Sequence, residues 1–134
     1  MRLAIITEGY APLNTSAAVQ LAALAQALRA LGHDPVVIVP TAGTGDPVQR
    51  DRVADIEVIR LKMPFGKGRG YVRRLFYEAL MPFVMRHRWK RIAADQKLDG
   101  IVWYSPSIFH GLFTSFLKRR HRVKAYLILR DIFP

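Results

Sequence analysis

The first forty residues predict the architecture of the whole chain. An apolar run at 2–7 is followed by a loop at 8–16, a helix-forming stretch at 17–31 and a second apolar run at 35–39. Strand, helix and strand in this order form the unit that places two parallel strands in one sheet. Ligands bind such sheets beyond the carboxyl ends of the strands, where the chain turns towards the helices. The loop at 8–16 is therefore the first candidate for a functional site.

The helix at 17–31 is predicted by leucines that recur at intervals of three and four residues, with alanines on the same side. The leucines are Leu21, Leu24, Leu28 and Leu31. Thr15 or Ser16 can cap its first turn, and Gly32 can end it. Both flanking apolar runs are continuous, which is typical of strands that are covered on both faces.

The rest of the chain repeats this alternation of strands and helices. The predicted elements are a strand at 56–61, a helix at 71–95, a strand at 101–104, a helix at 108–119 and a strand at 123–129. Pro82 is expected to kink the first of these helices or to split it. The segment 41–52 is rich in turn residues and is expected to be an exposed loop. The pattern predicts an α/β fold, a Rossmann-like parallel sheet of about five strands flanked by helices.

The net charge of the chain is unusually high, at +11 for 134 residues. It predicts a polyanionic partner: nucleic acid, an anionic membrane surface or phosphorylated substrates. Most of the net charge lies in residues 62–97, which include ten Lys and Arg but two acidic residues. Cysteine is absent, which excludes disulfides and thiolate metal sites, and no spacing of His, Asp and Glu predicts a metal site.

The stretch 71–91 combines an apolar helical stripe with basic residues on its flanks. The stripe consists of Val72, Leu75, Phe76, Ala79, Leu80, Phe83 and Val84. The basic residues, predicted to face a membrane, are Arg73, Arg74, Arg86, Arg88, Lys90 and Arg91. Such a helix can lie in the interface of an anionic leaflet, where each basic residue contributes roughly 1 kcal/mol. Alternatively, the stripe packs on the sheet and the basic residues form a solvated face. Both interpretations hold if the stripe faces inward and the basic residues on its flanks contact lipid.

Four motifs in order resemble a known family. The strand and Tyr-Ala-Pro turn within 5–12, and Gly32-His33 before the second strand, resemble the amino-terminal domain of GT-B glycosyltransferases of the family-4, retaining type. The Ser-Pro-Ser turn at 105–107 and the Arg-Asp-Ile-Phe-Pro sequence at 130–134 resemble the branch that makes bacterial O-antigen, capsule and exopolysaccharide chains. The resemblance covers the whole chain.

The resemblance implies one half of a two-domain enzyme whose Rossmann-like domains face a cleft. Residues 1–134 are then a single acceptor-side domain, incomplete at its C-terminus and without the donor-binding domain, so we expect this fragment alone to be inactive. The implied reaction moves a hexosyl-type sugar from a nucleotide diphosphate sugar to a lipid-linked or glycan acceptor. The implied location is cytoplasmic, peripheral at the inner face of the plasma membrane, and no cofactor is expected.

Arg130 and Asp131 form the candidate catalytic pair at the end of the fifth predicted strand. Arg130 stands where many members of the family have a His. Arginine stays protonated and cannot act as a general base, but it can hold charge that develops on a diphosphate leaving group. The alternative is an ion pair that only fixes a loop.

The candidate substrate-binding residues lie in the loops after the first and fourth strands. Many family members carry a Gly-Gly pair in the first loop, where this chain has Leu-Asn-Thr-Ser at 13–16. A helix start there still offers free N–H groups and a positive dipole end to phosphate. Turn and helix-cap chemistry explains the same residue types. The candidates are Glu8, Asn14, Thr15, Ser16, Ser105 and Ser107.

The alternative function is a basic α/β module that binds nucleic acid or a nucleotide without enzymatic activity. The charge favours it. However, the chain has no helix-turn-helix, zinc-finger or aromatic RNA-binding signature, and its basic residues lie beside apolar ones. The favoured interpretation predicts a sugar nucleotide, an acceptor and an anionic membrane surface as partners, and no nucleic acid.

Overall fold

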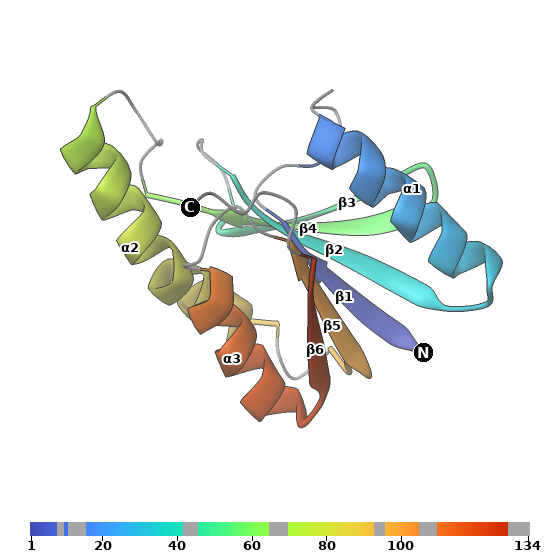
Figure 1. The fold of residues 1–134 in the computed structure, drawn as a ribbon. Helices are drawn as coiled ribbons and strands as arrows, with labels where there is room; N and C mark the ends of the chain where they lie inside the picture. The colour runs from blue at the N-terminus through green and yellow to red at the C-terminus, as the bar shows by residue number, and fades with distance from the viewer. Residues whose placement is uncertain are drawn as a thin grey trace.

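A computed structural model of the chain describes residues 1–7, 10, 16–41, 46–64, 70–92, 96–104 and 110–128. The elements in chain order are β1 (Arg2–Ile6), α1 (Ser16–Ala30), β2 (Asp34–Thr41), β3 (Val48–Val53), β4 (Ile56–Lys62), α2 (Tyr71–Trp89), β5 (Gly100–Tyr104), α3 (His110–His121) and β6 (Lys124–Ile128). One six-stranded sheet has the order β3-β4-β2-β1-β5-β6. Helix α1 covers one face of it, and α2 and α3 cover the other (Figure 1). The predicted α/β class with a Rossmann-like sheet is confirmed.

Five of these strands run parallel, with β1 at their centre. Ile5 of β1 lies opposite Val37 of β2 on one side and Val102 of β5 on the other. Along the chain, β2 and β4 are added on one side of β1, and β5 and β6 are then added on its other side. The direction of building therefore reverses between β1 and β5, which is the topological switch point of the sheet.

Alternating side chains of the strands supply two separate apolar clusters, one on each face. Under α1, Ile5 and Val37 pack with Leu21 and Ala25 of the helix. On the opposite face a larger cluster joins the sheet to α2 and α3. Its largest fully buried side chains include those of Trp89, Phe113, Met81 and Met85. Because both faces of the central strands are covered, β1 and β2 are apolar and buried from Ala4 to Ile6 and from Val36 to Val39.

Helix α1 ends as the sequence predicts, in a turn built around Gly32. Gly32 has φ 90°, and its N–H donates to the carbonyl oxygen of Arg29 at 3.0 Å. The N–H of His33 donates to the carbonyl of Leu28 at 3.0 Å. This pair of hydrogen bonds is a Schellman motif, which needs a left-handed residue such as glycine. Leu31, predicted as the last residue of this helix, follows its end at Ala30 and is 74% exposed.

The prediction of a loop at 41–52 is wrong for its second half, where β3 pairs antiparallel with β4. The turn between them consists of Ala54 and Asp55, whose φ values are both positive, at 49° and 66°. Two left-handed residues form the tight turn that suits a two-residue hairpin. Helix α1 holds this turn, because Gln26 donates to the carbonyl of Ala54 at 2.7 Å and Arg29 pairs with Asp55 at 2.7 Å. Residues 42–45 lie outside the described residues.

Helix α2 continues through Pro82 as a single helix, so the predicted split does not occur. Four of its five buried side chains recur every fourth residue, at Tyr77, Met81, Met85 and Trp89, and pack in the cluster that joins α2 to the sheet and α3. The fifth is Pro82. The predicted apolar stripe lies on the opposite side of the helix. Of the alternatives that the sequence leaves open, packing of the whole stripe on the sheet is therefore wrong.

The exposed fractions of the stripe show how far it lies from the core. They are 69% for Val72, 60% for Leu75, 66% for Phe76 and 59% for Phe83. Of the stripe residues, Val84 does pack against the buried cluster. Helix α2 thus has two apolar faces, and the sheet covers the one that carries methionines and tryptophan.

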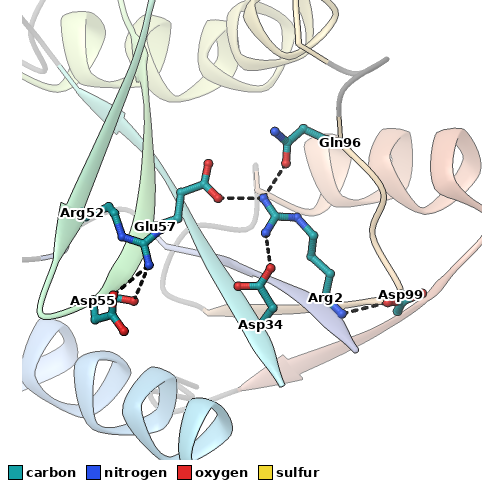
Figure 2. Close-up of polar contacts among 7 residues, drawn as sticks. All are labelled: Arg2, Asp34, Arg52, Asp55, Glu57, Gln96 and Asp99. Atoms are coloured by element: carbon teal, nitrogen blue, oxygen red, sulfur yellow. Dashed lines mark hydrogen bonds and ion pairs between the residues drawn. The ribbon is translucent and has the colours of Figure 1, made fainter. Parts of the chain in front are cut away.

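At the amino ends of the strands, Arg2 ties several elements together (Figure 2). Its guanidinium donates to Asp34 at 2.6 Å, to Glu57 at 2.9 Å and to Gln96 at 2.7 Å. Its backbone N–H donates to the carboxylate of Asp99 at 2.8 Å. Burial lowers the pKa of Arg2, but the hydrogen bonds to Glu57 and Asp34 and the negative charges of these two residues together raise it above its ordinary value. This network fixes the edge of the sheet that lies opposite the predicted site.

Candidate functional site

The carboxyl ends of the parallel strands lie together at one edge of the sheet. Ile6 of β1 lies opposite Ile38 of β2 and Trp103 of β5, and Tyr104 of β5 lies opposite Ile128 of β6. The segments that follow β1, β5 and β6 therefore start from three adjacent strands. These are the segments that carry the predicted catalytic and substrate-binding residues, and β1 and β5 flank the switch point where α/β sheets bind ligands.

Most of the predicted site residues themselves fall outside the described residues. They are Glu8, Asn14, Thr15, Ser105, Ser107, Arg130 and Asp131. Ser16 is described as the first residue of α1. A helix thus begins after the central strand, as the phosphate-binding hypothesis requires. The individual roles of these residues stay predictions.

Three buried residues mark the described part of this edge. The N–H of Thr7 donates to the carbonyl of Ile38 at 3.2 Å, which extends the contact of β1 with β2. Tyr10 and Tyr104 are 3% and 4% exposed, and both belong to the apolar cluster under α1. Burial raises the pKa of Tyr10, so its phenol stays protonated at neutral pH. The sheet end beside the switch point is therefore packed with aromatic side chains.

The outer surface of α2 and α3 is a second candidate region. We call its apolar part, at the start of α2, the outer face: Tyr71, Val72, Leu75, Phe76 and Leu80, each at least 39% exposed. Because α2 connects the carboxyl end of β4 to the amino end of β5, its first turns lie towards the same edge as the predicted site. The outer face is thus near the edge where ligands are expected.

The six basic residues predicted to face a membrane have different surroundings. Arg73, Lys90 and Arg91 are exposed. Arg74 lies 3.5 Å from Glu78. The remaining two contact other elements.

Arg88 points away from the outer face, since its Nε donates to the carbonyl of Lys62 at 3.3 Å. Arg86 lies 4.8 Å above the ring of Phe116, a residue of α3. Of the six, Arg86 is the one that the structure brings together with exposed residues of α3.

A groove of about 560 Å³ runs between α2 and α3. Its lining consists of Pro82, Phe83, Arg86, Leu112, Ser115, Phe116, Arg119 and Arg120. It lies on the helical layer and not at the carboxyl edge of the sheet. Arg119 and Arg120 were not among the predicted site residues. The signal that points to them is their spacing from Leu112 and Phe116, which places all four on the exposed side of α3.

Comparison with protein families supports the first interpretation of the sequence. Residues 15–132 match the model of the glycosyl transferase 4-like domain. The chain belongs to this family. The match begins at residue 15, just before α1, and includes the segment after β5, the residues after β6 as far as 132 and both helices of the outer surface. A comparison with curated proteins found no significant match.

Family membership gives the glycosyltransferase domain a sugar donor and an acceptor as its general partners. Among the described residues, no group of three His, Asp and Glu side chains could hold a metal ion. No helix in the described ranges combines the length and the apolar character needed to cross a membrane. In the described part of the glycosyltransferase domain, the outer surface of α2 and α3 presents exposed apolar side chains and positive charge.

Proposed function

We propose that this glycosyltransferase domain belongs to an enzyme that moves a hexosyl-type sugar, with retention, from a nucleotide diphosphate sugar to a lipid-linked acceptor. The enzyme acts in cell-surface polysaccharide synthesis, on the cytoplasmic side of the plasma membrane. The observation that carries this proposal is the outer face of α2, an exposed apolar surface beside the ligand-binding edge of the sheet. A lipid-linked acceptor must reach that edge from a bilayer.

The energetics favour docking of this surface on an anionic bilayer. Burying an exposed Leu or Phe side chain completely contributes about 1.5–3 kcal/mol, and several such side chains lie on the outer face. Basic residues near the surface each add about 1 kcal/mol. An amphipathic helix of this kind lies in the interface plane and does not span the bilayer.

Removing the outer face tests the docking. The variant Val72→Ser/Leu75→Ser/Phe76→Ser is expected to weaken binding to vesicles that contain anionic lipid by at least ~30-fold. The matched control, Val19→Ser/Leu31→Ser/Leu127→Ser, removes exposed apolar side chains elsewhere and should bind as the wild type does. Co-sedimentation measures both. Equal binding by the two variants, or wild-type binding that ignores anionic lipid, would refute the proposed membrane docking.

The proposed chemistry places Arg130 at the diphosphate leaving group. In the full-length enzyme, Arg130→Gln is expected to lower kcat by about 10²–10³-fold, because one charged donor to the transition state is lost. Arg130→Lys keeps the charge without the bidentate geometry and should retain more activity. Sugar transfer to the lipid-linked acceptor and the anomeric configuration of the product are measured. Unchanged kcat in Arg130→Gln would remove the residue from the mechanism.

We assign the donor mainly to a second Rossmann-like domain, as the family resemblance implies. Residues 1–134 alone are then expected to transfer no sugar. Detectable transfer by this purified chain from a nucleotide diphosphate sugar would contradict that assignment.

A further inference from the structure

The groove between α2 and α3 has an apolar half and a basic half. Phe83 and Leu112 are 59% and 55% exposed, and they lie one turn before Arg86 and Phe116 along their respective helices. Arg119 and Arg120 follow in the last turn of α3. Both helices run from the carboxyl edge of the sheet to the amino edge, so they are parallel and side by side (Figure 1). The apolar half therefore lies towards the outer face of α2, and the basic half away from it.

The charge of the groove fits a single compact anion. Arg86, Arg119 and Arg120 line it, and α3 contains no acidic residue. The acidic residue of α2, Glu78, is near Arg74 and outside the groove. Arginine forks bind phosphate oxygens in pairs, and three of them around one groove can hold a phosphodiester from several sides. Ser115 adds a hydroxyl to the same lining.

The apolar half fits an anion that carries hydrocarbon better than a free phosphate. A free phosphate contacts only the basic half and leaves Phe83, Leu112 and Phe116 in water. An amphiphile with its phosphate at the arginines and a chain over these three side chains covers both halves. Its chain then points in the same direction as the outer face of α2, which is the part proposed to enter the bilayer.

We propose that this groove binds the headgroup of one anionic phospholipid, taken from the membrane on which the domain docks. The inference rests on the docking proposed above. It adds a defined site for one lipid molecule to the general attraction between the basic protein and an anionic bilayer. Arg86, Arg119 and Arg120 hold the phosphodiester, and Phe83, Leu112 and Phe116 hold the first part of an acyl chain. The bound lipid fixes the orientation of the domain relative to the bilayer.

A short-chain lipid below its micelle concentration separates this site from attraction to a charged surface. We expect dihexanoyl phosphatidylglycerol to bind the protein with 1:1 stoichiometry in calorimetry. It should bind at least ~10-fold more tightly than glycerol phosphate, which lacks the chains, or dihexanoyl phosphatidylcholine, which lacks the net charge. The variant Arg86→Gln/Arg119→Gln/Arg120→Gln should bind it at least ~10-fold more weakly. The matched control, Arg50→Gln/Lys97→Gln/Lys118→Gln, changes the charge equally at exposed residues outside the groove and should stay within about twofold of the wild type.

The outcomes distinguish the groove from the docking surface. Equal losses in the two charge variants, equal affinity for glycerol phosphate, or no saturable binding would overturn the lipid site, even if vesicle binding through the outer face stands. Conversely, saturable binding of the short-chain lipid that only the groove variant loses supports the site, even if the protein fails to sediment with vesicles. Circular dichroism and thermal unfolding of each variant show that the helices are intact. Exposed Arg→Gln changes in helices are expected to preserve the fold, since both residues are good helix formers.

Discussion

The two faces of α2 have similar apolar character and opposite surroundings. On the inner face, Tyr77, Met81, Met85 and Trp89 are at most 6% exposed. On the outer face, Val72, Leu75 and Phe76 are at least 60% exposed. One helix thus carries both a core-forming surface and a surface that the described part of the chain leaves in water.

The comparison with α1 shows that a helix of this sheet needs only one apolar face. Helix α1 packs Leu21 and Ala25 into the core, while its surface carries Gln20 and Gln26 and one large exposed apolar side chain, that of Val19. The core requirement of α2 is met by its inner face alone. Large exposed apolar patches on soluble domains mark interaction surfaces, so the second face of α2 points to function and not to folding.

The largest effect is expected at Trp89, the end of the inner face. Its ring meets Phe113 edge-on with centroids 6.4 Å apart, and its Nε1 donates to Nε2 of His121 at 3.2 Å. Trp89→Ala is expected to lower the free energy of unfolding by about 3–5 kcal/mol, because a fully buried ring leaves a cavity. Trp89→Phe keeps most of the packing and should lose clearly less. Chemical denaturation measures both, and a loss under 1 kcal/mol for Trp89→Ala would show that the inner face does not carry the core.

A smaller effect is expected from pH, through His121 of α3. Burial and the charge of Arg120 lower the pKa of His121, so the unfolded chain takes up this proton more readily than the folded one. The contribution to stability is complete above the ordinary histidine pKa of about 6.5 and is lost as the pH falls below it.

Protonated His121 also cannot accept the hydrogen bond from Trp89, which is worth about 1 kcal/mol. The free energy of unfolding should therefore fall from pH 7.5 to pH 5.5, and fall less in His121→Gln, whose amide oxygen still accepts. The other histidines are the same in both proteins, so the comparison isolates position 121. An identical pH dependence in the variant would mean that His121 does not couple α2 to α3.

The parallel core of the fold was predictable because buried strands and their crossover helix have distinct periodicities, as 2–7, 17–31 and 35–39 show. The β3 hairpin was not, since its turn has Ala54 and Asp55 where a tight hairpin turn usually has Asn-Gly. Hydrogen bonding to Arg52 and the charge of Arg29 lower the pKa of Asp55 and favour its charged form. The turn thus depends partly on a contact with α1, which local sequence does not reveal.

The candidate sites also include features that the sequence predicts and features that it does not. Parallel pairing predicts that the segments after β1, β5 and β6 start from the same edge of the sheet. The register of these strands confirms it. Which face of α2 packs on the sheet was not predictable. Apolar residues spaced by three and four occur on both faces, and this periodicity does not distinguish the buried face from the exposed one. The groove was not predictable either, since Arg86 and Arg119 meet only through the packing of two helices.

The smallest effect on stability, and the sharpest test of the comparison, is expected at Phe76 on the outer face. Phe76 is 66% exposed, so replacing it by serine removes little buried surface. Serine and phenylalanine also have similar helix propensities. Phe76→Ser should therefore change the free energy of unfolding by no more than about 0.5 kcal/mol, in contrast to Trp89→Ala. Denaturation in urea measures the change, and light scattering should show less self-association than for the wild type. A loss above about 2 kcal/mol would mean that the outer face is covered in the folded chain, and the two faces of α2 would then both belong to the core.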